Sequence, residues 1–435
     1  MIERHYQYDP SGQLVQWQDR HRGLTRYRYD AGGRITRSQI GLAKDWGPIG
    51  VRADASGNTT GQPMAANEQF YWDAASNPLP DEAAASQGNI VPGNRLLVWQ
   101  DARYTYDEHG NLIERLQGQR GSAAQTRTHF TWDAAHQLAR AEVAHGPDET
   151  ASTQSFTYTY DALGRRIAKT DAFGTSHFAW DDDRLVLEQR GGNETTFVYH
   201  PELFVPLAQI HNGALHHLHT DHLGTPLEAS NDAGEITWQV IYRTWGNVVT
   251  EEVTEIQQRL RFQGQYFDAE TGLHYNRFRY YECSIGRFAS QDPIGLFGGE
   301  NQYEYAPNPI EWIDPLGLEK CRLCAADLMA MGKPPPKQNN PHRHHIVREK
   351  APKNWSAMNR KLVTRAQAIL KRRGIGLNRD RRNFTWAENG AGAHTVATSR
   401  YILCVLQKAN AKGQSAVEAA LKRLGQDARR GIFSR

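Results

Sequence analysis

Two adjacent histidines, His344 and His345, stand in the stretch PHRHHIVREK (341–350). Neutral imidazole suits both metal binding and proton transfer near pH 7, so the pair has the residue types needed for metal-assisted hydrolysis. If the stretch is a strand, neighbouring side chains point to opposite faces, and the two histidines do different jobs. The alternative is a surface HxHH that chelates a metal without catalysis.

Two cysteines, Cys321 and Cys324, form a single CxxC. One such pair is half of a zinc site, so a structural zinc that also uses His342 and a pair of reduced spectator thiols both stay open. A zinc deaminase needs H-x-E before P-C-x-x-C, and residues 319–435 contain no H-x-E, which disfavours that class of enzyme.

The net charge of +3 conceals two oppositely charged parts. Residues 319–435 hold 25 Lys and Arg against 7 Asp and Glu, whereas residues 1–318 hold 26 against 41. Such asymmetry indicates two bodies with different jobs, and the basic one suits nucleic acid. A solvated basic surface, or a non-catalytic binder of the ribosomal type, has the same charge.

Other classes of protein are disfavoured by what the sequence lacks. Four cysteines are too few for a disulfide framework, the N-terminal MIERHYQYDP has no signal-peptide core, and no run of eighteen apolar residues occurs. We therefore expect no membrane span, and delivery out of a cell would need a dedicated apparatus or a fused partner.

The basic part has mostly helical patterns. Residues 358–374 place apolar side chains at helical spacing and end at Gly374, with basic residues on the other face. A second helix is expected around Tyr401–Leu406, and SAVE (415–418) has the capping-box pattern that opens a third. RNFTW (382–386) is strand-like.

The acidic part repeats one short phrase of alternating aromatic residues followed by Asp and turn residues. The copies are YQYDPSGQL (6–14), YRYDAGGRI (27–35), YTYDEHGNL (104–112) and YTYDALGRR (158–166), with weaker ones at 70–79, 130–138 and 178–186. Alternation predicts half-buried strands, and D-x-x-G predicts hairpin turns. We expect a long antiparallel sheet built hairpin by hairpin.

The phrase resembles the tyrosine-aspartate (YD) repeat of Rhs proteins, whose sheet spirals into a hollow shell. Residues 219–248 resemble a late shell segment, and residues 261–318, which end in DPLGL, resemble the C-terminal signature of the family. Family shells contain more repeats than residues 1–318 supply. The resemblance therefore leaves three interpretations open: a C-terminal fragment with a missing N-terminal shell portion, an orphan cassette, or one half of a split shell.

The Rhs resemblance implies self-cleavage directly after DPLGL, between Leu318 and Glu319. The implied chemistry is that of an aspartyl protease, in which two carboxylates share a proton. Asp292 in QDPIGL and Asp314 in IDPLGL fit this role, and Arg287 could orient a carboxylate. Asp-Pro steps also simply form turns.

The order HHIV, ILKRRGIGLN (369–378), RRNFTW and AGAHT (391–395) resembles the AHH group of HNH/endonuclease VII-type nuclease toxins. The resemblance implies His344 and His394 as ligands of one divalent ion (Mg²⁺, Mn²⁺ or Zn²⁺), His345 as general base and Asn383 as its orienting partner. These nucleases often carry a further histidine after the first one on the last helix, and HTVATSRY has none. Phosphate contacts are expected from a basic set: Arg343, Arg360, Lys361, Arg365, Lys371, Arg372 and Arg373.

We therefore predict a multidomain chain: an all-β antiparallel YD-repeat shell segment (1–260), a self-cleavage region (261–318) and a mainly α domain with a small ββα-metal core (319–435). The predicted function is an antibacterial effector, made in the bacterial cytoplasm and delivered by a contact-dependent apparatus such as type VI secretion. Its released nuclease would cut DNA, or less favourably RNA, in the target cytoplasm. An acidic immunity protein would protect the producer. The alternative is a non-catalytic surface or adhesion protein with a polyanion-binding tail.

Overall fold

The computed structural model describes residues 2–20, 22–41, 64–81, 89–147, 151–201, 203–318, 320–322, 341–345, 357–373, 375, 384–388, 396–411 and 413–429. The chain divides into two compact units, Met1–Lys320 and Cys321–Arg435. The regions predicted as 1–260 and 261–318 belong to the same unit. No helix in the described residues is long and apolar enough to cross a membrane.

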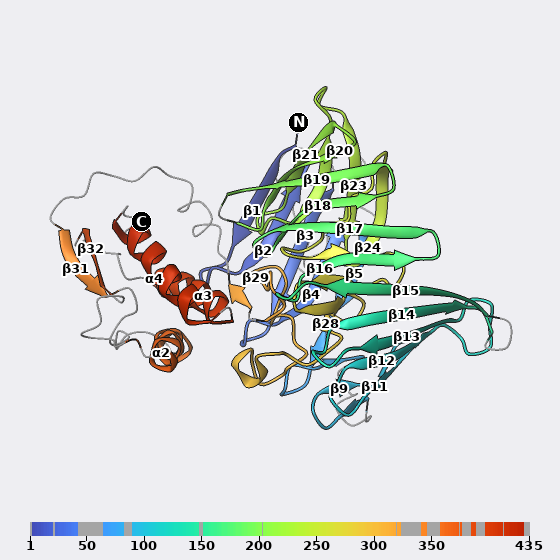
Figure 1. Cartoon of the computed structure of the whole chain (residues 1–435), viewed down its shortest axis with the longest axis horizontal. Coiled ribbons are helices and arrows are strands. Elements are labelled where there is room, and N and C mark those ends of the chain that lie inside the picture. The colour runs from blue at the N-terminus through green and yellow to red at the C-terminus, as the bar shows by residue number, and fades with distance from the viewer. Residues whose placement is uncertain are drawn as a thin grey trace, which may run out of the picture. The chain divides into compact units, whose positions relative to one another are not determined.

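Most of the first unit is antiparallel sheet, in which each strand pairs with the next one along the chain (Figure 1). A five-stranded sheet contains β1 (Arg4–Tyr8), β2 (Leu14–Asp19), β3 (Gly23–Tyr29), β4 (Ile35–Gly41) and β5 (Met64–Gln69). Two small hairpins follow, β6 (Tyr71–Trp72) with β7 (Pro78–Leu79) and β8 (Ile90–Val91) with β9 (Arg95–Leu96). The predicted hairpin-by-hairpin antiparallel sheet is confirmed.

A fifteen-stranded sheet runs in chain order from β10 to β24. Its strands are β10 (Val98–Trp99), β11 (Ala102–Tyr106), β12 (Leu112–Gln117), β13 (Thr126–Trp132), β14 (Leu138–His145), β15 (Ser152–Tyr160), β16 (Arg166–Asp171), β17 (Gly174–Asp181), β18 (Arg184–Arg190), β19 (Asn193–Tyr199), β20 (Pro206–His211), β21 (Ala214–Thr220), β22 (Pro226–Ser230), β23 (Ile236–Tyr242) and β24 (Val248–Thr254).

The aspartate of each repeat builds the hairpin turn. Asp161 Oδ1 accepts hydrogen bonds of 2.9 Å from the backbone N–H groups of Leu163 and Arg165, and Gly164 takes the left-handed conformation that the turn requires. In six other turns the aspartate Oδ1 also accepts a hydrogen bond from the backbone N–H of the residue four positions later: Asp9, Asp30, Asp73, Asp107, Asp133 and Asp221. The predicted D-x-x-G turns are therefore confirmed.

The second aromatic residue of the repeat ties neighbouring hairpins together. A β-bulge between Thr159 and Tyr160 precedes the turn, and Tyr160 Oη donates a 2.8 Å hydrogen bond to Leu138 O in the preceding hairpin. The equivalent donors are Tyr29 to Leu14 O, Trp72 to Ile35 O, Trp132 to Leu112 O and Trp180 to Arg166 O. The repeat therefore specifies both its own turn and its spacing to the repeat before it.

Residues 261–318 form a plug that packs against both sheets. The plug contains β25 (Tyr266–Phe267), β26 (His274–Asn276), β27 (Arg279–Glu282) and β28 (Arg287–Phe288), then the short 3₁₀ helix η2 (Gly295–Phe297) and β29 (Trp312–Ile313). Tyr275 and Tyr280 join the apolar cluster of the fifteen-stranded sheet, and Tyr281 and Phe288 join that of the five-stranded sheet. Almost every plug strand residue is buried, so the plug forms part of the core of the unit together with the two sheets.

The described part of the second unit contains three helices and short strands. They are β30 (Cys321–Arg322), β31 (Pro341–His345), α2 (Ala357–Arg372), β32 (Phe384–Glu388), α3 (Val396–Ala411) and α4 (Gln414–Arg429). Buried Leu370, Leu406 and Leu421 lie in one apolar cluster that joins the helices.

The predicted helices over 358–374 and around 401–406, and the strand within 382–386, are confirmed. The third helix begins at Gln414 rather than at a Ser415 cap. Ser415 therefore lies inside the first turn of α4 rather than before it, which corrects its expected place as the cap, and Gln414 Nε2 donates to Glu418 Oε1 at 3.1 Å.

Candidate active site

The plug brings two aspartates onto one arginine. Arg279 Nη2 lies 3.1 Å from Asp292 Oδ2 and 3.3 Å from Asp314 Oδ2. All three side chains are at most 4% exposed. Two buried carboxylates that contact one guanidinium repel each other when both are ionised, which favours a state with one proton on the pair.

The arginine and the two aspartates come from three different parts of the plug. Arg279 is the first residue of β27, and its other nitrogens donate to the backbone carbonyls of Gly317 and, at 2.9 Å, Gln302. Asp292 follows β28 and starts a turn, in which its Oδ1 accepts a 3.0 Å hydrogen bond from Ile294 N–H. Asp314 follows β29 and starts the last turn of the plug. Both Asp-Pro steps therefore form turns and also present their carboxylates to one site.

The backbone of Leu318 lies against this carboxylate pair. Leu318 N–H donates a 3.0 Å hydrogen bond to Asp314 Oδ1. A Cβ placed on Gly298 would clash with Asp292 Oδ2 and would lie 2.8 Å from Leu318 O. Asp292 Oδ2 and the Leu318 carbonyl oxygen therefore border the same small space, which only a glycine at position 298 leaves open.

Burial controls the protonation of the pair. Burial raises the pKa of Asp292 to about 6, although the Arg279 charge opposes the shift. Burial also raises the pKa of Asp314 above its ordinary value, again against Arg279. Burial lowers the pKa of Arg279, which its two carboxylate partners oppose. The site therefore favours a state in which one carboxyl group keeps its proton up to a pH of about 6, well above the range of an ordinary aspartate.

Arg287, which was expected to orient a carboxylate, has other partners. Its guanidinium donates to Asn77 Oδ1 at 3.0 Å and to Asn94 O, and it lies over the ring of Tyr303. The arginine that contacts the carboxylates is Arg279, which sequence reasoning missed. The signal for it was weak: Arg279 alternates with Arg277 in NRFRYY, and only the plug strand buries it between two distant turns.

The predicted nuclease residues are only partly within the described structure. His344 and His345 lie on β31, where they pair with Thr385 and Phe384 of β32. Arg343 lies on the same strand, opposite Trp386. Asn383 and His394 lie outside the described residues. β31 and β32 form one antiparallel ribbon, and the ββα-metal core and the proposed metal and base roles stay predictions.

The predicted phosphate-binding residues of α2 divide into two groups. Lys361, Arg365, Lys371 and Arg372 are exposed. Arg360 lies in α2, but its side chain is outside the described set. Arg373 differs, because its Nε donates to Asn410 Oδ1 at 2.8 Å and it is half-buried. Arg373 therefore links α2 to the end of α3.

Within the described portion of the chain, no group of three or more His, Cys, Asp or Glu side chains could hold a metal ion. Cys321 lies on β30, whereas Cys324 is outside the described residues, so the zinc alternative for this pair stays untested.

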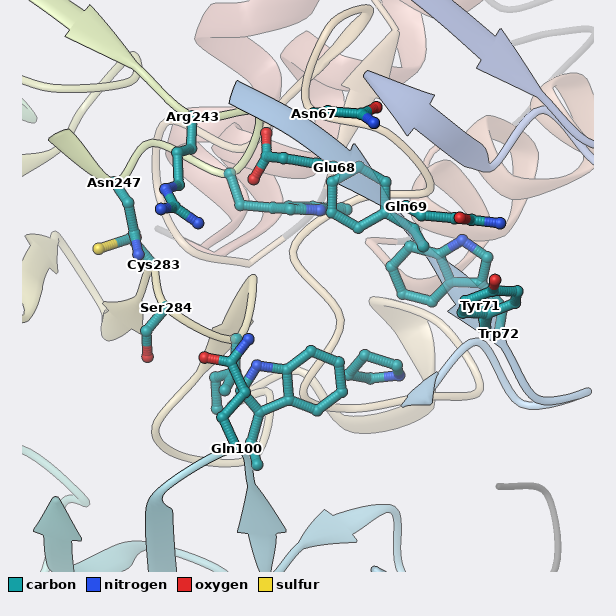
Figure 2. Close-up of a pocket in the computed structure, with 15 residues that line it drawn as sticks. Asn67, Glu68, Gln69, Tyr71, Trp72, Gln100, Arg243, Asn247, Cys283 and Ser284 are labelled. Carbon is teal, nitrogen blue, oxygen red and sulfur yellow. The ribbon is translucent and has the colours of Figure 1, made fainter. Parts of the chain in front are cut away.

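A separate cavity of about 270 Å³ lies where the five-stranded sheet, the 243–247 turn and the plug meet (Figure 2). Glu68 Oε2 accepts hydrogen bonds from Thr244 N–H at 2.8 Å and Thr244 Oγ1 at 2.7 Å beside it. The thiol of Cys283 lines the cavity, but burial raises its pKa to about 12, which keeps it protonated. The cavity wall includes neither Asp292 nor Asp314, so it is distinct from the carboxylate pair.

Comparison with known families matches residues 54–307 to the teneurin YD-shell model and residues 8–39 to the RHS repeat. The chain belongs to the YD-shell family. The matched model ends at residue 307, inside the first unit, and the YD-shell match covers more than half of the chain.

Three relatives within this YD-shell family are named toxins or nucleases. Double-stranded DNA deaminase toxin A of Burkholderia cenocepacia is 39% identical over 72% of this chain and 22% of its own length. Toxin protein Tse5 of Pseudomonas aeruginosa is 35% identical, over 73% and 27%. Probable deoxyribonuclease RhsA of Dickeya dadantii is 32% identical, over 69% and 21%. The chain thus spans about a quarter of the length of these YD-shell relatives.

Among solved structures, TcdB2-TccC3-TEV matches 73% of this chain and 18% of its own, at 18% identity with a TM-score of 0.43.

Proposed function

We propose that this chain belongs to an Rhs toxin that cuts itself between Leu318 and Glu319 and so releases the basic domain that begins at residue 319. The observation that carries the proposal is the contact of Asp292 and Asp314 with one arginine beside the Leu318 backbone. Toxin and nuclease names among the relatives support the same class of protein.

The proposed reaction is hydrolysis of one peptide bond by one water molecule. Asp314, taken as the ionised member of the singly protonated pair, accepts a proton from water, and the water oxygen attacks the Leu318 carbonyl carbon. Asp292, protonated, donates its proton to the Leu318 carbonyl oxygen. The C–N bond then breaks, the Glu319 nitrogen takes up the proton held by Asp314, and Asp292 recovers its own as the new carboxyl group of Leu318 forms.

Arg279 would keep the two carboxylates in different protonation states. A single guanidinium balances one negative charge, so the pair with one proton is neutral overall, whereas the fully ionised pair leaves a buried negative charge. The Leu318 N–H bond to Asp314 would fix the scissile carbonyl relative to this pair.

The released domain is proposed to be a metal-dependent nuclease. His344 and His394 would hold one divalent ion, His345 would act as general base and Asn383 would orient it. When bound, the ion would stabilise the charge on the cleaved phosphodiester. The exposed basic residues of α2 would bind the phosphate groups of the nucleic acid, independently of its base sequence. DNA is favoured as substrate over RNA because relatives are named deoxyribonucleases.

The biological setting follows from the same proposal. The effector would be made in a bacterial cytoplasm, delivered by a contact-dependent apparatus such as type VI secretion, and active in the target-cell cytoplasm. An acidic immunity protein would neutralise the strongly basic domain in the producing cell. Further shell repeats would complete the enclosure around the released domain.

The decisive experiment expresses the full chain with Asp292→Asn, Asp314→Asn and, as a matched control, Asp183→Asn, which removes an aspartate bound to Arg277. Intact-mass measurement should find a fragment ending at Leu318 in the wild type and the control, and an uncut chain in the two site variants. A wild-type chain that stays whole after folding, or site variants that still cut after Leu318, would overturn the self-cleavage proposal.

A further inference from the structure

Lys320, the second residue beyond the proposed cut, is anchored to the plug. Its Nζ forms an ion pair with Glu304 Oε2. The two side chains are only 16% and 14% exposed, so the pair is largely shielded from solvent. Salt and solvent screen an ion pair at this depth less than they screen a surface pair.

Glu304 is a rigid receptor for this lysine. It stands between Tyr303 and Tyr305, which are each 1% exposed. Its own N–H donates to Asn301 O at 3.2 Å, and it forms a β-bridge with Arg287. The lysine side chain also lies against Gly299, where an added Cβ would be 3.3 Å from Nζ. Glu304 is therefore part of the plug, whereas Lys320 lies on the downstream side of the proposed cut.

The backbone around the proposed cut is thus held on both sides. On the upstream side, Leu318 N–H donates to Asp314 Oδ1 at 3.0 Å. On the downstream side, the Lys320 ammonium is fixed by Glu304. A peptide held at both ends beside the carboxylate pair loses little further entropy on reaching the reactive geometry. The Lys320 charge also lowers the pKa of Asp292 and of Asp314, though less than Arg279 does.

We propose that Glu304 is a specificity-determining residue, which selects a basic side chain at the second position after the cut. This inference rests on the proposed self-cleavage at Leu318. It predicts that the shell accepts released domains of different kinds provided that their second residue is Lys or Arg. It also predicts that Glu304 keeps hold of the new N-terminal segment directly after cleavage.

The test is a charge swap followed by cleavage kinetics. The full chain is made by in vitro translation as wild type, Glu304→Lys, Lys320→Glu and the double swap, with Glu300→Lys as a matched control at an exposed neighbouring carboxylate. Each single reversal should slow cleavage at least about tenfold, since it removes the pair and places like charges together. The double swap should return the rate to within about threefold of wild type, and Lys320→Arg should cleave normally.

Single reversals that cleave at the wild-type rate, or a double swap no faster than the slower single variant, would overturn the selection role of Glu304. If the melting curve shows that Glu304→Lys does not fold, the test compares the cleavage rates of Lys320→Glu and Lys320→Arg. Equal rates for these two variants would overturn the selection role of Glu304. Failure of the proposed self-cleavage looks different, because the wild type would then remain whole or Asp292→Asn would still cut.

Discussion

Arg287 donates a 3.0 Å hydrogen bond to the side-chain oxygen of Asn77, which lies 210 positions earlier in the chain. Asn301 Nδ2 donates to the same oxygen at 2.9 Å, while Asn77 Nδ2 donates to Asp73 and to Asn94. Asn77 is 1% exposed and all its side-chain hydrogen-bonding positions are used. One amide therefore ties a turn of the sheet region to the plug segment that carries Asp292.

Asn77→Ala should slow self-cleavage and destabilise the first unit. The change leaves the buried Arg287 and Asn301 donors without their acceptor, which costs about 2–3 kcal/mol of unfolding free energy. Urea unfolding and the cleavage time course would measure the two effects. Asn193→Ala is the control, because it removes the 2.9 Å hydrogen bond to Asn212 at an exposed hairpin and should change neither. Normal cleavage in Asn77→Ala would show that this amide does not position the plug.

Gly298→Ala should stop self-cleavage while the chain still folds. The new methyl group would clash with Asp292 Oδ2 and press on Leu318 O, which forces the carboxyl group away from the carbonyl that it must protonate. Gel analysis of the folded chain would detect the uncut product. Gly192→Ala is a suitable control, because nothing lies within 4 Å of its added Cβ. Cutting of Gly298→Ala at the normal rate would contradict the role given to Asp292.

The rate of self-cleavage should fall as the pH rises through about 6. Burial raises the pKa of Asp292 to about 6, so its carboxyl group is protonated below that pH and ionised above it. The proposed reaction needs Asp292 protonated, and each further pH unit lowers that population about tenfold. Uncut translated chain diluted into buffers from pH 5 to 8 would give the profile. A rate that instead increases over this interval would make ionised Asp292 the base.

The sequence predicted those structural elements that are determined by residues close together in the chain. Asp161 and its equivalents could be assigned to turns because an aspartate followed by glycine acts on its own neighbours. The α2 helix followed from apolar spacing alone. Arg279 could not be found this way, because its partners Asp292 and Asp314 reach it only after the plug folds. Asn77 likewise stands in a weak repeat copy, and nothing local separates it from a turn residue.

In the released domain, nucleic-acid cleavage and nucleic-acid binding should depend on different residues. His345→Ala should abolish metal-dependent cleavage of plasmid DNA and leave binding unchanged, because the exposed charges of α2 supply the affinity. Lys371→Ala with Arg372→Ala should weaken binding and reduce the slope of log K against log salt by about 2, one for each lost phosphate contact. Fluorescence anisotropy across a salt series, beside cleavage assays with Mg²⁺, Mn²⁺, Zn²⁺ or EDTA on DNA and RNA, would measure both effects.

Lys422→Ala, an exposed charge on α4, provides the matched control for this pair of binding residues. Its salt slope should change by less than that of the double variant, since α4 lies outside the predicted phosphate-binding set. Intact DNA and RNA under every metal, with His345→Ala and wild type binding equally, would contradict a catalytic role for the histidines of β31. That result would favour the alternative function, a non-catalytic protein in which the YD repeats act and the basic tail only binds polyanions.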